Sequence, residues 1–368
     1  MRGDGLVEMT SGRDHIVQTS TASGPPRPVR IVVDAMGGDY APTEIVRGAM
    51  QASCAVGVHV LLVGDPDRVD EELKHTSCGQ ACVSVVPVQS AIGMDDKPLQ
   101  SFRSKPDASI AVAMRLLALG EADALITAGN TGAMVTAACL ILGRLEGIKR
   151  PAITIVIPTP EHQVVLLDAG ANVSATAQQL LQFALIGSAF AKCSLGVCEP
   201  RVGLLNVGAE ITKGGPTLVE AQGLLAGSHL NFIGNVEGND IAAGKADVIV
   251  CDGYVGNVVL KHTEAWSQAV LAMLKNRLNR NPLLWPGYPF VMMAMPHLRN
   301  GLSSAYYGGA TLLGVKGLCI KCRGNSRANG IRNAVAAAVR YHRAGLMPQL
   351  AESLSATTKT AGAGDTTP

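Results

Sequence analysis

A group of polar side chains lies between Phe232 and Lys261, around two glycine-containing loops. Each loop follows a short apolar run, and the second loop, 252–257, leads directly into a helical pattern. A strand, a glycine-rich turn and a helix N-terminus in succession place backbone N–H groups where they can bind an anion. The polar residues of this stretch are Asn235, Glu237, Asp240, Asp252, Asn257 and Lys261.

The same combination of an apolar run and a small polar loop recurs along the chain. Such loops follow Val33, Thr127, Leu167, Leu205, Ile233 and Cys251. Ligands of open α/β sheets bind beyond the carboxyl ends of the strands. We therefore expect these loops to line one polar cleft.

The elements that would position these loops alternate between apolar strands and helical patterns. This alternation predicts a doubly wound α/β fold, with a mostly parallel sheet, right-handed crossovers and helices on both faces. A long helix is expected at 258–278, a turn at 307–314 and a closing helix at 328–344. Strands are expected at 29–33, 58–63, 83–88, 124–127, 153–157, 164–167, 202–205, 230–233, 247–251 and 317–320.

Composition narrows the class of protein. The chain has 368 residues, 47% of them hydrophobic and 16% charged, which is typical of a folded protein. A net charge of +2, without a basic run among aromatics, gives no support for nucleic-acid binding. The sequence contains no run of 18 apolar residues, so no membrane-spanning helix is predicted. The nine cysteines are an odd number and several lie in apolar runs, so reduced thiols in a cytoplasmic protein are expected.

The domain prediction is a single α/β domain at 29–345. The segment 1–28 has no apolar core of a signal peptide and is expected to be a disordered extension. The segment 346–368 is expected to be a disordered tail because its end is low in complexity. Within 258–300, an apolar and methionine-rich stretch broken by prolines could be a core-facing connector, a dimer contact, or a surface for lipid or an acyl chain.

Several common catalytic motifs are absent from the sequence. It contains no strand-linked G-x-G-x-x-G with a following acid, no G-x-x-x-x-G-K-[ST] and no G-x-S-x-G. The eight histidines have no metal-ligand spacing. The remaining loops of glycine, asparagine and acid suit anion binding and stabilisation of an oxyanion better than covalent catalysis.

Taken together, the ordered motifs resemble the bacterial phosphate acyltransferases of the PlsX type, over about residues 30–344. The motifs are VDAMGGD at 33–39, MDDKP at 94–98, AGNTGA at 128–133, LDAGAN at 167–172, GLLNVG at 203–208, GNVEG at 234–238 and DGYVGN at 252–257 with Lys261. The chain departs from the family pattern at Ala209, Thr311 and Arg323.

The resemblance implies reversible transfer of a fatty acyl group from acyl-[acyl carrier protein] to inorganic phosphate, which gives acyl phosphate for phospholipid synthesis. It also implies a homodimer and a fold similar to the phosphate acetyltransferases and the isocitrate and isopropylmalate dehydrogenases. No cofactor or metal is expected. The expected location is the cytoplasm, peripherally on the inner face of the membrane, with the membrane acyl-phosphate:glycerol-3-phosphate acyltransferase as a partner.

Residue roles follow as hypotheses, because phosphate is itself the nucleophile and a thiolate, with a thiol pKa of about 8.5, leaves readily. Lys261 with Arg103 and Lys105 would offset the phosphate charge, and Asn172, Asn235 and Asn257 would donate to the oxyanion. The expected cradle for phosphate or pantetheine comprises Gly37, Gly38, Gly129, Asn130, Thr131 and Gly132. Asp34, Asp168 and Asp252 would orient loops or lysines.

Other functions remain open on the sequence alone. The first is a phosphotransacetylase-like acyltransferase that uses acyl-CoA, and the second is a non-catalytic scaffold for lipid-synthesis enzymes. A carrier protein is acidic and would need a basic patch, for which Lys275, Arg277, Arg280 and Arg299 are candidates. A dehydrogenase has the least support because the nucleotide fingerprint is missing.

Overall fold

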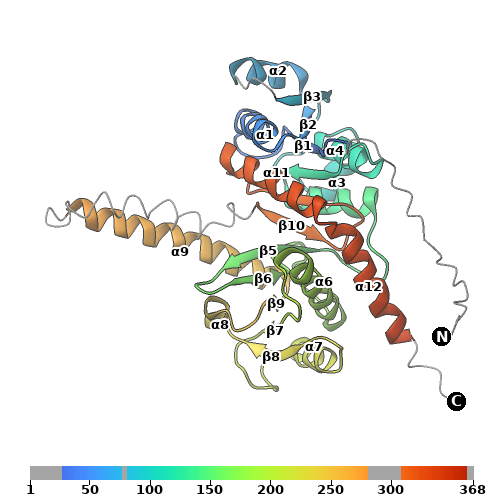
Figure 1. Cartoon of the computed structure of the whole chain (residues 1–368), viewed down its shortest axis with the longest axis vertical. Coiled ribbons are helices and arrows are strands. Elements are labelled where there is room, and N and C mark those ends of the chain that lie inside the picture. Colours follow the sequence, from blue (N-terminus) through green and yellow to red (C-terminus); the bar gives the residue numbers. More distant parts are fainter. Residues whose placement is uncertain (1–26, 77–80, 281–307, 363–368) are drawn as a thin grey trace, which may run out of the picture.

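The structure is a computed structural model that describes residues 27–76, 81–280 and 308–362. An 11-stranded sheet runs through the molecule, and helices pack on both of its faces (Figure 1). The predicted α/β class and the mostly parallel sheet are confirmed. The strands are β1 Arg30–Asp34, β2 His59–Gly64, β3 Cys82–Pro87, β4 Ala124–Thr127, β5 Ala152–Pro158, β6 Gln163–Leu167, β7 Val202–Leu205, β8 Phe232–Val236, β9 Val248–Val250, β10 Ala310–Leu313 and β11 Cys319–Lys321.

The helices mostly follow the strands whose apolar runs they cover. They are α1 Thr43–Val56, α2 Pro66–His75, α3 Pro98–Ser104, α4 Ser109–Ala118, α5 Thr131–Ala137, α6 Ala177–Leu195, α7 Pro216–Ala226, α8 Gly238–Ala243, α9 Gly253–Arg280, α11 Ala328–Arg343 and α12 Leu346–Gly362, with the π-helical turn η1 Ala138–Leu142 after α5. Two apolar clusters lie on opposite faces of the sheet. One contains buried residues of α1, α6, α11 and α12, and the other contains those of α4, α5 and η1.

The sheet combines two groups of parallel strands that run in opposite directions. The strand order is β3-β2-β1-β4-β11-β10-β5-β6-β9-β7-β8. Strands β10 and β5 separate the groups, because β10 is antiparallel to β11 and β5, and β5 is antiparallel to β6. The register pairs Lys321, the last residue of β11, with Ala310, and pairs Thr311 with Thr154, which itself pairs with Leu167 at the end of β6.

The carboxyl ends of β11 and β6 therefore lie almost level on the two sides of β10 and β5. Loops from the two strand groups face each other across this level. The sequence had predicted instead that these loops lie along one edge of a parallel sheet. The segment 307–314, expected to be a turn, supplies the dividing strand β10. Its Thr-Leu-Leu run is buried, and burial on both faces favours a strand.

Helix α9 extends away from the sheet, as Figure 1 shows in orange. It begins earlier than expected, at Gly253 rather than near residue 258, so Asn257 lies within its second turn. Asp252 caps the first turn, since its Oδ1 accepts a hydrogen bond from Val255 N at 2.8 Å. The distal part of the predicted 258–300 contact segment, from residue 281, lies outside the described residues.

The prediction of a disordered tail at 346–368 is wrong for residues 346–362, which form α12. Leu346, Leu350 and Leu354 recur at every fourth position and are at most 5% exposed, so an apolar stripe packs this helix onto the core. The helix was not predicted from the composition of the tail, because small and polar residues separate these leucines. At the other end, Arg27 belongs to the described structure and pairs with Asp123 at 2.6 Å.

Two further findings concern cysteines and membranes. Cys82, Cys139, Cys193, Cys198, Cys251, Cys319 and Cys322 are free thiols, as expected, whereas Cys54 is disulfide-bonded, contrary to the expectation. Among the helices in the described ranges, none combines the length and the apolar character needed to cross a bilayer.

Candidate active site

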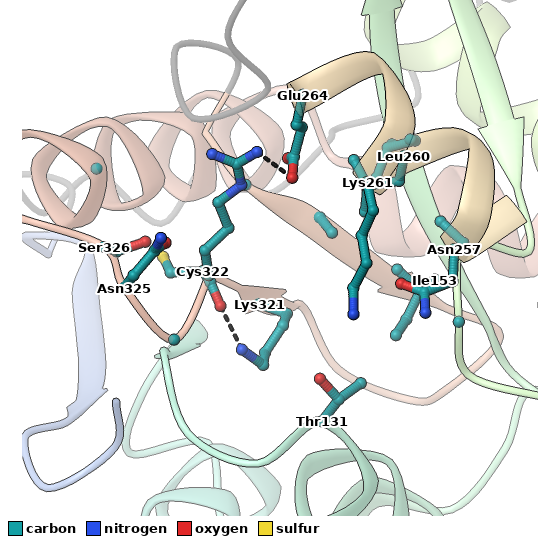
Figure 2. A pocket seen from close by; sticks show the side chains of 18 of the residues that line it. Thr131, Ile153, Asn257, Leu260, Lys261, Glu264, Lys321, Cys322, Asn325 and Ser326 are labelled. Atoms are coloured by element: carbon teal, nitrogen blue, oxygen red, sulfur yellow. Dashed lines mark hydrogen bonds and ion pairs between the residues drawn. The ribbon is translucent and has the colours of Figure 1, made fainter. Parts of the chain in front are cut away.

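A cavity of about 670 Å³ lies where the two strand groups end. Its walls come from the loops after β1, β4, β6 and β11, together with β5 and α9 (Figure 2). Of the loops predicted to form one cleft, those after β7 and β8 contribute no residue to it. The polar lining residues are Asp39, Thr131, Asn257, Lys261, Glu264, Gln268, Lys321, Arg323, Asn325 and Ser326.

Helix α9 presents Asn257 and Lys261, one turn apart, to the cavity, because residues i and i+4 share a helix face. In Figure 2 the amide of Asn257 and the amine of Lys261 lie side by side and face the hydroxyl of Thr131. Two glycines allow α9 to lie this close to the loop after β6. A Cβ on Gly256 would be 1.9 Å from Asp168 O, and one on Gly253 would be 2.3 Å from Asn172 O.

Asp168 organises the loop after β6. Its Oδ1 accepts hydrogen bonds from the N–H groups of Ile153, Gly170 and Ala171, at 2.9–3.1 Å. Its Oδ2 accepts from both the backbone N and the Nδ2 of Asn172, at 2.7 and 2.8 Å. Burial raises the pKa of Asp168, and these hydrogen bonds act in the opposite direction. The carboxylate is therefore occupied in holding the loop.

Asn172 donates its second amide hydrogen to Pro151 O at 2.8 Å, so both Nδ2 hydrogens serve the same loop. Asn235 is buried, donates to Glu210 O at 2.9 Å and does not line the cavity. These placements favour supporting roles for the two asparagines. Of the predicted oxyanion donors, Asn257 is the one whose side chain faces the cavity.

The loop after β4 is fixed by a buried carboxylate. Asp34 Oδ2 accepts from Thr127 Oγ1 at 2.8 Å, and Thr127 Oγ1 in turn accepts from Gly129 N at 3.0 Å. Gly37 lies against this loop, since a Cβ there would be 2.6 Å from Gly129 N. Gly38 has a φ of 109°, which disfavours any other residue. Asp34, Gly37, Gly38 and Gly129 thus shape the loop and do not line the cavity.

Asn130 caps α5 by accepting from Ala133 N at 3.0 Å, and it donates to Met94 O at 2.8 Å. A Cβ on Gly132 would meet Pro98 Cγ at 2.5 Å, so the segment that begins α3 packs closely on α5. This packing leaves the Thr131 side chain directed into the cavity (Figure 2).

Arg103 and Lys105 lie away from the cavity lining. Arg103 is exposed on α3. Lys105 Nζ donates to Asp96 Oδ2 at 3.0 Å and to Ala91 O at 3.1 Å. The cations that sequence reasoning placed beside Lys261 are thus replaced by Lys321 and Arg323.

Lys321 is the most unusual residue of the cavity, because its side chain is buried in the sheet at the end of β11. Its Nζ donates to the carbonyl oxygen of Ala128 at 3.2 Å and to that of Cys322 (Figure 2). Burial lowers the pKa of Lys321, and the charges of Asp34 and Asp39 oppose that shift. A buried ammonium bonded to neutral carbonyls is poorly compensated, so an anion in the adjacent cavity would stabilise it.

Arg323 and Glu264 form an ion pair that joins the loop after β11 to α9. Both residues line the cavity, and Figure 2 shows Glu264 at the side opposite Thr131. The sequence signal for Arg323 was its departure from the family pattern. The signal for Lys321 was a single charge within an apolar strand, which is rare unless the charge has a partner or a function.

The cavity offers no activated nucleophile among the described residues that line it. Burial raises the pKa of the Cys322 thiol to about 12, so the thiol is protonated at neutral pH. Among the described residues, the lining of the cavity contains no histidine that could activate Ser326 or Thr131. Within the described ranges, no group of histidine, cysteine and acid residues is placed to hold a metal ion. The site suits binding of an anion that itself attacks.

Comparisons with known proteins agree with this chemistry. Residues 29–348 match the sequence profile of a family described as "Fatty acid synthesis protein". The chain is 44% identical over 326 residues to a phosphate acyltransferase of Desulforamulus reducens, covering 89% of this chain and 97% of that protein. It is 47% identical over 308 residues to a phosphate acyltransferase of Heliobacterium modesticaldum, covering 83% and 92%.

Among solved structures, a phosphotransacetylase from Streptococcus pyogenes superposes with a TM-score of 0.55 at 16% identity, covering 90% of this chain and 95% of that one. The EutD phosphotransacetylase from Staphylococcus aureus gives a TM-score of 0.53 at 16% identity, covering 86% and 94%. These likenesses confirm the predicted similarity to the phosphate acetyltransferase fold. The matches in sequence show more: this chain belongs to the fatty acid synthesis protein family of bacterial phosphate acyltransferases, and it is an acyltransferase.

Proposed function

We propose that this enzyme transfers a fatty acyl group reversibly from the thioester of acyl carrier protein to inorganic phosphate, and that the acyl phosphate feeds phospholipid synthesis. One observation carries the proposal: the side chains of Lys261, Lys321 and Thr131 face a single cavity, whose described lining residues include no activated nucleophile. The names of the relatives, phosphate acyltransferase, support phosphate as the acceptor.

In the proposed reaction, phosphate binds between Lys261 and Lys321 and receives a hydrogen bond from Thr131. A phosphate oxygen attacks the carbonyl carbon of the thioester, and a C–O bond forms. Asn257 donates its amide hydrogen to the tetrahedral oxyanion, whose collapse breaks the C–S bond. The pantetheine thiolate leaves and takes a proton from solvent. Positioning and electrostatic stabilisation supply the catalysis.

The proposal that acyl carrier protein is the donor rests on the positive charge of α9. Lys275 and Arg277 are exposed on α9, beyond the turn that carries Lys261, and could contact an acidic carrier. A homodimer, attachment to the inner face of the membrane, and delivery of acyl phosphate to the membrane acyl-phosphate:glycerol-3-phosphate acyltransferase are parts of the same proposal. Its alternative is an acyltransferase that uses coenzyme A thioesters.

The experiment incubates the purified protein with phosphate and either a long-chain acyl-[acyl carrier protein] or the matching acyl-CoA. Free thiol is measured with a thiol reagent, and acyl phosphate is trapped as a hydroxamate. We expect equal amounts of both products, dependent on phosphate, and a higher kcat/KM with the carrier. A higher kcat/KM with acyl-CoA would identify coenzyme A thioesters as the donors in place of the carrier protein. Absence of acyl phosphate with both donors would favour a non-catalytic scaffold.

A further inference from the structure

One wall of the cavity is apolar and continues beyond it. Ile153 and Ile155 of β5 and Leu260 of α9 line this wall. A second, smaller cavity of about 20 Å³ begins there and shares Ile155, Leu260 and Glu264 with the first. Its remaining lining is Val156, Ile157, Pro158 and Thr263. The two cavities therefore adjoin each other, and a path from the first to the second would run between β5 and α9.

The path is apolar because of the two-residue period of a strand. Side chains at alternate positions of β5 share one face, so Ile153, Ile155 and Ile157 follow one another in a row of about 13 Å. They are at most 8% exposed. The row starts beside the phosphate-binding residues and leads away from them, under the turn of α9 that contains Leu260 and Thr263.

We infer that this β5–α9 groove binds the fatty acyl chain of the substrate. The inference rests on the proposed function, because it needs phosphate between Lys261 and Lys321. The reacting carbonyl carbon must then lie next to phosphate, and the chain must leave the polar cavity along an apolar route. The groove starts at that point, whereas Met94, the other large apolar side chain in the described lining of the cavity, is 42% exposed.

The narrowness of the groove makes its far end sensitive to substitution. Thr263 lines the second cavity and does not line the first, so it lies apart from the proposed reacting groups. A phenylalanine there would fill the space that chain carbons need. Each buried methylene contributes roughly a fourfold gain in affinity, so loss of about two methylenes predicts about a tenfold effect.

The test compares wild type with Thr263→Phe, using acetyl- and palmitoyl-pantetheine as donors. We expect kcat/KM for the palmitoyl thioester to fall about tenfold, with the acetyl thioester unchanged. The control is Val270→Phe on the same helix, a half-exposed position outside both cavities, which leaves both donors unaffected. If Thr263→Phe leaves the ratio of kcat/KM for the palmitoyl thioester to kcat/KM for the acetyl thioester unchanged, the inference of an acyl-chain groove is wrong.

A second measurement needs no variant. Palmitoyl-pantetheine with a photoreactive diazirine on its chain is bound to the wild-type protein and irradiated, and the labelled peptides are identified by mass spectrometry. Labels in residues 152–158 or 260–264 are expected, and labels around Met94 would contradict the inference. If wild type forms no acyl phosphate even from palmitoyl-[acyl carrier protein], the proposed function itself fails. If the wild-type protein is active but is labelled elsewhere, the groove is refuted and the proposed function still stands.

Discussion

Lys321 connects the buried sheet to the chemistry of the cavity. Its ammonium is held by the carbonyl oxygens of Ala128 and Cys322, which lie in the segments after β4 and β11. The carbonyls orient the charge without neutralising it, so the ammonium stays available for a phosphate oxygen. Replacing a buried charge by an apolar side chain of similar size is often neutral or stabilising, so this residue can be tested without unfolding the protein.

The pH dependence of phosphate use follows from this burial. The pKa of Lys321 is lowered from 10.5 by burial, so the ammonium loses its proton at a lower pH than an exposed lysine. Phosphate binding needs the charged form, and kcat/KM for phosphate should fall as pH rises through this pKa. In Lys321→Arg the side chain stays charged above pH 12, and the alkaline decline should weaken or move to higher pH. Identical alkaline profiles in both proteins would rule out this role.

The residues of the site differ in how readily they can be identified from the sequence alone. Lys261, Asn257 and Thr131 lie in glycine-rich loops or just after them, and sequence reasoning selected them. Lys321 and Arg323 were missed because Lys321 ends, and Arg323 follows, an apolar strand whose position next to β4 depends on a pairing between residues almost 200 apart. Conversely, Lys105 was selected for its charge, although that charge is already paired with Asp96.

At the scale of elements, the first turns of α9 determine where Asn257 and Lys261 lie. Gly256 brings the helix against the carbonyl of Asp168, and Asp168 itself holds the loop after β6. The position of these two side chains therefore depends on a close backbone contact and on a hydrogen-bonded loop. A displacement of α9 would move both side chains together.

Gly256→Ala tests this dependence. The new Cβ would lie 1.9 Å from Asp168 O, and relief of that clash requires the helix to move. We expect a loss of about 2 kcal/mol of unfolding free energy and a large fall in kcat. Gly223→Ala on α7 is the matched control: no atom lies within 4 Å of its Cβ, and it should add about 1 kcal/mol of stability. Equal effects of the two changes in urea unfolding would contradict the account.

Helix α12 gives a second prediction at this scale. Leu350 is fully buried against the core, so Leu350→Ala should cost about 3 kcal/mol of unfolding free energy. The exposed Glu352, on the same helix, should tolerate alanine within about 0.5 kcal/mol. Chemical denaturation of both variants measures the difference. If Leu350→Ala proves as mild as Glu352→Ala, then α12 does not contribute to the folded core.

At the scale of the whole molecule, two parallel strand groups of opposite direction meet at β10 and β5. The alternation of strands and helices in the sequence predicts the class of fold and most strand positions, because each local period is strong. The reversal of direction was not predicted, because it depends on a strand, β10, that reads as a glycine-rich turn. That reversal brings the loops after β4 and β11 opposite those after β6 and β9, and thereby forms the cavity.

We propose that phosphate binds between Lys261 and Lys321 in this cavity. The most direct measurement is the apparent KM for phosphate of Lys261→Met and Lys321→Met, with Arg103→Met as control. A lost charge-assisted hydrogen bond predicts a rise of roughly 10- to 100-fold in each lysine variant and no change in the control. Unchanged phosphate KM values in both lysine variants, or an equal rise in Arg103→Met, would contradict the account.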